Sequence, residues 1–69
     1  MTYEQFLDLI SRGPAPGHRM GQTIFNLLCA TREDLSEKIR ATDLDPFYDD
    51  DKIPAALAWL GEHWEVTDG

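Results

Sequence analysis

Residues 18–30 have the sequence HRMGQTIFNLLCA, and they are predicted to form the central helix of the molecule. Along one side of this segment, apolar residues recur at the three- and four-residue spacing of an α-helix. Gly21, Phe25 and Cys29 widen the apolar face to nearly half of the circumference, so the helix is expected to contact neighbours on several sides. Gly21 lowers helix propensity by about 1 kcal/mol relative to Ala, which close approach of a neighbouring backbone or ring would explain. The main apolar stripe consists of Met20, Ile24, Leu27 and Leu28.

A first helix is predicted before this segment, over residues 3–12. Thr2 and Gln5 have capping-box spacing at its start, and Gly13 can adopt the left-handed conformation after its last turn. The two prolines and two glycines of GPAPG, residues 13–17, end the helix and predict a short turn. Its apolar stripe, at the spacing i, i+3, i+4 and i+7, consists of Tyr3, Phe6, Leu7 and Ile10.

Two more helices are predicted after the central one. The third covers residues 32–41, where only Leu35 and Ile39 face inward. The last follows a cap at Asp50 or Asp51 and continues to about residue 64. Its core stripe consists of Ile53, Leu57, Leu60 and Trp64.

The fold class predicted from these segments is all-α, in a single domain of residues 1–69. Asp45 before Pro46 has the pattern of an N-cap followed by proline at the first helical position. The prediction is therefore a compact bundle of four helices with short connections and a short helical turn at residues 45–49. A chain of 69 residues is too small for a binuclear metal centre, a Rossmann unit or a two-domain cleft. The predicted core consists of Phe6, Ile10, Ile24, Leu28, Leu35, Ile39, Phe47, Ile53, Leu57 and Leu60.

Charge is distributed unevenly along the chain. The net charge is −7, from 13 acidic and 6 basic residues. Residues 1–42 contain five of each sign and are neutral, so the whole excess comes from residues 43–69, with eight acidic residues and one lysine. Nucleic-acid backbones and anionic lipids both need clustered cations, so direct binding to either is not expected.

Cysteine usage and hydropathy point to a reducing compartment. Cys29 is the only cysteine, so an internal disulfide and a CxxC site are impossible, and a buried thiol is expected. No apolar stretch approaches the 18 residues or so that a membrane span needs. The first residues, MTYEQFLDLIS, lack the basic segment of a signal peptide, so a cytoplasmic location is expected.

Catalytic and metal-binding patterns are weak. Three aspartates at 49–51 invite a calcium interpretation, but a loop starting at Asp43 has Tyr48 where an EF-hand needs Gly and Pro54 where it needs Glu. His18 and His63 lack partners at zinc-ligand spacing. Nucleophile, HExxH and P-loop motifs are also missing, so the expectation is a protein that is not an enzyme and has no cofactor or metal.

Two groups of residues are candidates for contact with a partner. The aspartates either cap helices on a solvated surface or form an acidic recognition surface. Trp59, about 120° from the core stripe and near Ala55 and Val66, is either packed in the core or an exposed anchor of the kind enriched at binding hot spots. The predicted partner-binding residues are Asp43, Asp45, Asp49, Asp50, Asp51, Trp59 and Glu62.

A polar line opposite the main stripe of the central helix allows two interpretations. Arg19, Gln22 and Asn26 fall within about 60° of one another. They are either solvated or hydrogen-bonded to the loops, or they contact a ligand or partner. An antiparallel packing of helices would also bring Arg19 to the aspartates after Tyr48.

The pattern RxGQxxFN at residues 19–26, followed by Asp34, Leu35 and Ile39 and then by DPFY at residues 45–48, resembles small uncharacterised proteins encoded in bacterial and phage genomes. The resemblance covers about 40 residues and includes the position of DPFY ahead of an apolar helix. It implies a compact one-domain protein with a phage or prophage association. Because that group has no assigned activity, the resemblance transfers no functional residue.

The function expected from size and charge segregation is a non-enzymatic module that binds another protein with a basic surface. If the phage association holds, one concrete form is an inhibitor that presents its acidic surface to a nucleic-acid-binding host protein. The alternative is a structural or assembly subunit that self-associates through the apolar patch around Trp59. Oligomeric state discriminates between the two.

Overall fold

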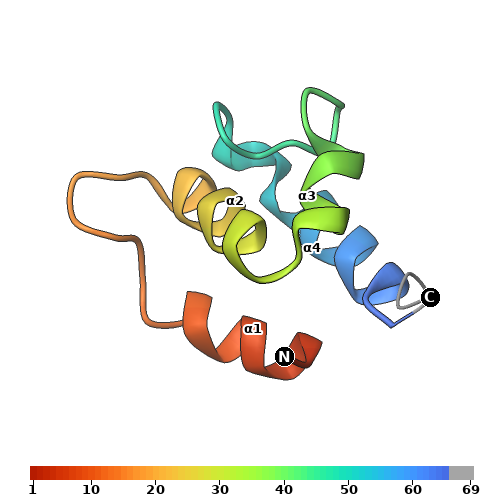
Figure 1. Ribbon diagram of the computed structural model, residues 1–69. Helices are drawn as coiled ribbons and strands as arrows, with labels where there is room; N and C mark the ends of the chain where they lie inside the picture. The colour runs from red at the N-terminus through yellow and green to blue at the C-terminus, as the bar shows by residue number, and fades with distance from the viewer. Residues whose placement is uncertain (66–69) are drawn as a thin grey trace.

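The computed structural model describes residues 1–65 (Figure 1). Four α-helices follow one another in the order α1 (Tyr3–Ile10), α2 (Met20–Thr31), α3 (Glu33–Ile39) and α4 (Ile53–His63). A short 3₁₀ helix, η1 (Asp50–Lys52), directly precedes α4. Residues 1–65 contain no strand, so the predicted all-α bundle is confirmed. Val66, which the sequence placed near Trp59, lies outside the described residues.

Helix α1 begins as predicted. The Thr2 hydroxyl accepts a hydrogen bond from the Gln5 backbone N–H at 3.1 Å, and the Gln5 side chain accepts one from the Thr2 N–H at 2.9 Å. The helix ends at Ile10, before the predicted end at residue 12. Gly13 and Gly17 then adopt φ values of +96° and +79°, which favour glycine, and they shape the turn toward α2.

The predicted core is correct for the first three helices and shifted in the fourth. On α4 the buried residues are Ala56 and Leu60, and Trp64, directly after the helix, continues the same face at the i, i+4 and i+8 spacing. Because the small Ala56 side chain is central to this buried face, Ile53 and Leu57 lie at its edges and are only half-buried, which corrects the prediction for both. Phe47 is also half-buried, and Phe25 occupies the interior instead.

The predicted helical turn at residues 45–49 is wrong in its conformation. One carboxylate oxygen of Asp45 accepts a hydrogen bond from the Phe47 N–H at 2.9 Å, and the other accepts one from the Ala41 N–H at 2.8 Å. Asp49 N–H donates to the Pro46 carbonyl at 3.2 Å. These bonds close a tight turn without a helix, because the Asp45 side chain competes with helical backbone bonding. The helical turn follows instead in η1.

Helix α3 ends at Ile39, before the predicted residue 41. Ala41 has a φ of +63°, and this left-handed backbone turns the chain away from the helix axis. The segment after α3, green to teal in Figure 1, then returns to lie beside α2.

Gly21 is the point of closest approach between that segment and α2. A Cβ added at Gly21 would lie 2.1 Å from the Pro46 carbonyl oxygen and 2.6 Å from a carboxylate oxygen of Asp50. The Gly21 N–H donates to the same Asp50 oxygen at 2.9 Å. The predicted close approach is therefore a backbone contact, and it fixes the position of the segment containing residues 46–50.

Contacts with α4 and with Trp64, directly after it, hold α1 in place. The Tyr3 hydroxyl donates to the Leu57 carbonyl at 2.6 Å, and Trp64 Nε1–H donates to the Met1 carbonyl at 3.0 Å. The Trp64 ring packs against Phe6 with a centroid separation of 5.0 Å. Among the described residues, we find no helix of sufficient length and hydropathy to cross a membrane.

Candidate partner-binding site

We call residues 43–51 the acidic loop, since five of them are aspartates. Three of these carboxylates accept hydrogen bonds from the backbone. Asp45 binds the N–H groups of Ala41 and Phe47, Asp49 binds that of Asp51 at 2.9 Å, and Asp50 binds that of Gly21. The sequence could not distinguish capping from recognition, and for these three side chains the structure shows a stabilising role within the fold.

Asp50 has a role that links distant elements. Gly21 lies in the first turn of α2, where backbone N–H groups lack partners within the helix. The Asp50 carboxylate, 29 residues away in sequence, satisfies one of these groups and places a negative charge at the positive end of the helix. It therefore acts as a tertiary cap that joins α2 to η1.

Asp43 and Asp51 are exposed and have no hydrogen bond or ion pair through their side chains to other residues in the described range 1–65. They flank the turn from either end of the loop. Glu62 is exposed as well, but it lies about 14 Å along the helix axis from the start of α4. The predicted site residues thus divide into the acidic loop and a second group, Trp59 and Glu62, toward the C-terminal end of α4.

Trp59 is half-buried, and its ring stacks on His63 with a centroid separation of 4.2 Å and an interplanar angle of 20°. His63 Nδ1 lies 2.8 Å from the Trp59 carbonyl oxygen, so the pair is held together along α4. Neither of the two sequence interpretations describes this position fully. Trp59 is only partly buried, but it packs against the hydrophobic core and does not project as an isolated anchor.

Tyr48 is the exposed aromatic residue of the acidic loop, with 83% of its surface accessible. Its ring contacts Phe47 edge-on at a centroid separation of 4.8 Å, and Phe47 in turn meets Phe25 edge-on at 5.9 Å. Sequence reasoning placed Tyr48 on a helical turn and did not select it. The signal that could have identified it is its position between Phe47 and three aspartates, at the apex of a turn set by Asp45 and Pro46.

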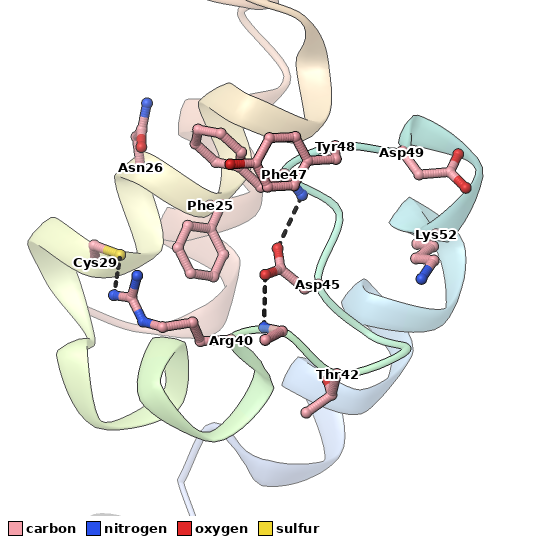
Figure 2. A pocket seen from close by; sticks show the side chains of 11 residues that line it. Phe25, Asn26, Cys29, Arg40, Thr42, Asp45, Phe47, Tyr48, Asp49 and Lys52 are labelled. Atoms are coloured by element: carbon pink, nitrogen blue, oxygen red, sulfur yellow. Dashed lines mark hydrogen bonds between the residues drawn. The ribbon is translucent and has the colours of Figure 1, made fainter.

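A groove of about 600 Å³ lies beside Tyr48, between α2 and the segment from Arg40 to Lys52. Figure 2 shows the rings of Phe25, Phe47 and Tyr48 gathered between these two walls. Phe25 is buried and Phe47 half-buried, so the base of the groove is aromatic. The residues at its rim are polar or small: Asn26, Cys29, Arg40, Thr42, Asp49 and Lys52.

The cations near the groove are largely engaged within the protein. The Arg40 guanidinium lies 5.2 Å from the centroid of Phe25 and 3.2 Å from a carboxylate oxygen of Glu37. It also donates to Cys29 Sγ at 3.8 Å. Cys29 is half-buried, and not fully buried as the sequence predicted. Arg19 donates to the Phe47 carbonyl, which fastens the loop to the start of α2.

The polar line on α2 therefore serves two purposes. Arg19 reaches the backbone of the acidic loop, not its carboxylates, and Gln22 accepts a hydrogen bond from the Arg19 N–H at 3.0 Å. Asn26 is exposed and lines the groove. The structural interpretation holds for the first two residues, and Asn26 remains accessible to a partner.

The described residues 1–65 contain no group of three or more His, Cys, Asp or Glu side chains that could hold a metal ion. The aspartates of the acidic loop point to different backbone groups or to solvent, which separates their oxygens.

Comparison with known proteins gives no relative for this chain: no family model, no curated protein and no solved structure matches it.

Proposed function

We propose that this chain is a small non-enzymatic protein-binding module whose acidic loop contacts a basic surface on another protein. The observation that supports this most directly is the exposure of Tyr48, an apolar ring with a polar tip, on a loop that carries most of the unbalanced charge. Tyrosine is one of the residues most enriched at binding hot spots.

The construction of the loop favours binding. Hydrogen bonds from Ala41, Phe47 and Gly21 to loop carboxylates, together with the bond from Arg19, hold the backbone around Tyr48. A surface already held in its bound conformation loses less entropy on association than a mobile one. Aspartates that do not contact the partner directly therefore still contribute to recognition by ordering the loop.

Charge supplies the second part of the proposal. A net charge of −7 on a 7.9 kDa chain steers a cationic partner toward it and accelerates encounter. Two exposed carboxylates, Asp43 and Asp51, are available for direct pairing at the rim of the contact. A cytoplasmic, phage-encoded inhibitor that covers a nucleic-acid-binding surface of a host protein is the concrete form that we favour, in line with the RxGQxxFN and DPFY resemblance.

The experiment is affinity capture from lysate of the native host with the wild-type chain, followed by titration of the captured protein. We expect Tyr48→Ala to weaken binding by about 10-fold or more, as for a hot-spot residue. Asp51→Asn should weaken it by a smaller factor that disappears at high salt, because exposed charges are screened.

Glu4→Gln is the matched control, since it removes one exposed carboxylate from α1 and leaves the loop intact. An affinity that is indifferent to salt, and equal for Tyr48→Ala and Glu4→Gln, would contradict the proposed function.

A further inference from the structure

We infer that the groove beside Tyr48 receives an apolar, preferably aromatic, side chain of the partner, and that basic residues flank this side chain in the partner's sequence. The inference rests on the proposed function and specifies the partner's chemistry. It joins two features that lie next to each other: an aromatic groove and an acidic loop with unpaired carboxylates.

The groove is large enough to admit a large side chain, and its base is aromatic. A volume of about 600 Å³ lies within the range of about 300–1,000 Å³ typical of binding pockets. Its base is formed by Phe25 and Phe47, whose rings already meet edge-on, and such a cluster accepts a further ring in an edge-on or offset arrangement.

Tyr48 supplies the wall that an occupant would cover. Its ring touches Phe47 on one side and is otherwise open to solvent, with 83% of its surface exposed. An incoming apolar side chain would bury part of the Tyr48 ring together with its own surface, which is favourable for both. The hydroxyl at the tip of the ring remains able to reach solvent or a polar group of the partner.

The charges around the groove select the residues that flank the occupant. The acidic loop has five carboxylates, whereas Arg40 is paired with Glu37 and Arg19 with a carbonyl oxygen. Lys52 is the remaining cation at the rim. The groove lining itself has two acidic residues, Asp45 and Asp49, and two cations, Arg40 and Lys52. The excess negative charge comes from the rest of the adjoining acidic loop, where Asp43 and Asp51 are exposed. Positive residues that flank the occupant on that side are therefore attracted, and negative ones are repelled.

A second copy of this chain is a poorer occupant. The large hydrophobic residues that the described part of the chain leaves exposed are Met1 and Tyr48. Two copies meeting at Tyr48 would bring their acidic loops together, and like charges disfavour that contact. Charge complementarity therefore points to a basic partner of different sequence.

The test uses the whole chain and three synthetic five-residue peptides with blocked ends. The first has a central tryptophan between two pairs of arginines, the second has alanine in place of the tryptophan, and the third keeps the tryptophan between two pairs of glutamates. Binding is measured by amide chemical-shift titration and by the rate at which iodoacetamide alkylates Cys29, whose sulfur lies at the groove rim.

We expect the arginine–tryptophan peptide to bind at least fivefold more tightly than either other peptide and to be the one that slows alkylation of Cys29. Asn26 is exposed and lines the groove, so Asn26→Phe should weaken binding of this peptide at least fivefold. Ala30→Phe, exposed on the same helix and outside the groove lining, is the matched control and should leave the affinity unchanged.

The two proposals fail in different ways. Equal affinity of the tryptophan and alanine peptides, or unchanged binding in Asn26→Phe, overturns the groove inference and leaves the acidic surface standing. Equal affinity of the arginine- and glutamate-flanked peptides overturns the charge selection and the proposed function with it.

Discussion

At residue 21, the backbone of helix α2 contacts the acidic loop directly, because Gly21 has no side chain to stand between them. The Pro46 carbonyl oxygen and the Asp50 carboxylate occupy the space that a side chain would need. Glycine is therefore required here because the acidic loop approaches the α2 backbone closely. A positive φ is not the reason, since Gly21 is helical.

We predict that Gly21→Ala lowers the free energy of unfolding by about 2–3 kcal/mol, because overpacking against a fixed backbone outweighs the gain in helix propensity. Gly61→Ala is the control: its nearest neighbour would be the edge of the Tyr3 ring at 3.1 Å, which can shift more easily than a backbone carbonyl. Urea unfolding measures both. A Gly21→Ala protein at least as stable as the wild type would contradict the contact.

Tyr3 makes stability depend on pH at the alkaline end. Burial raises the pKa of the Tyr3 hydroxyl above its ordinary value, because the charged phenolate is poorly solvated there. The folded state then holds this proton more tightly than the unfolded state. The stability that the protonated hydroxyl contributes is therefore complete below about pH 10, and it is lost as the pH rises above that value.

Thermal unfolding between about pH 9 and pH 11.5 checks this assignment. The wild-type melting temperature should fall more steeply over that range than that of Tyr3→Phe, which has no proton to lose. Tyr48→Phe, at an exposed ring, should follow the wild type. Identical slopes for Tyr3→Phe and the wild type would show that Tyr3 is not responsible.

At the level of elements, Arg32 connects the α2–α3 junction to the end of α4. Its guanidinium forms two 3.0 Å hydrogen bonds with the Asp34 carboxylate and a 2.6 Å bond with the Trp64 carbonyl, and it lies 5.0 Å from the centroid of the Trp64 ring. These contacts use the planar fork of arginine, which a lysine ammonium cannot reproduce.

Arg32→Lys should therefore destabilise the protein by about 1–2 kcal/mol, from lost hydrogen bonds to and from charged groups at a half-buried position. The matched control is Arg12→Lys, because Arg12 and Asp8 form an exposed i, i+4 ion pair. There the free energy of unfolding should change by about a few tenths of a kcal/mol at most. The measurement is the urea midpoint of unfolding for Arg32→Lys and Arg12→Lys. Equal midpoints for the two variants would rule out a special role for Arg32.

At the scale of the whole molecule, the radius of gyration of 11.0 Å is that of a compact chain of this length. Trp59 is half-buried against the hydrophobic core, and every copy has the same net charge of −7. We predict a monomer of 7.9 kDa in sedimentation equilibrium at physiological salt, with no change in Trp59→Asp. A dimer that Trp59→Asp dissociates would instead favour the self-associating assembly subunit.

The helices could be predicted from the sequence because the residues that start, end and orient each helix lie within a few positions of one another. The Thr2–Gln5 capping box, the GPAPG turn and the apolar stripe of residues 18–30 each depend on neighbouring positions, and each is present in the fold. The need for a close neighbour at Gly21 was also readable, since a helical glycine in an apolar face requires an explanation.

What the sequence could not determine is which distant groups meet. Three features depend on how the segment after α3 passes α2. They are the hydrogen bond from Gly21 to Asp50, the contact of Arg32 with Trp64 and the exposure of Tyr48. By itself, the sequence determined an acidic all-α chain with its excess charge in the C-terminal third. Only the tertiary structure decided which carboxylates are bound to backbone and which face solvent, because hydrogen bonds between residues far apart in sequence form only once the helices have packed.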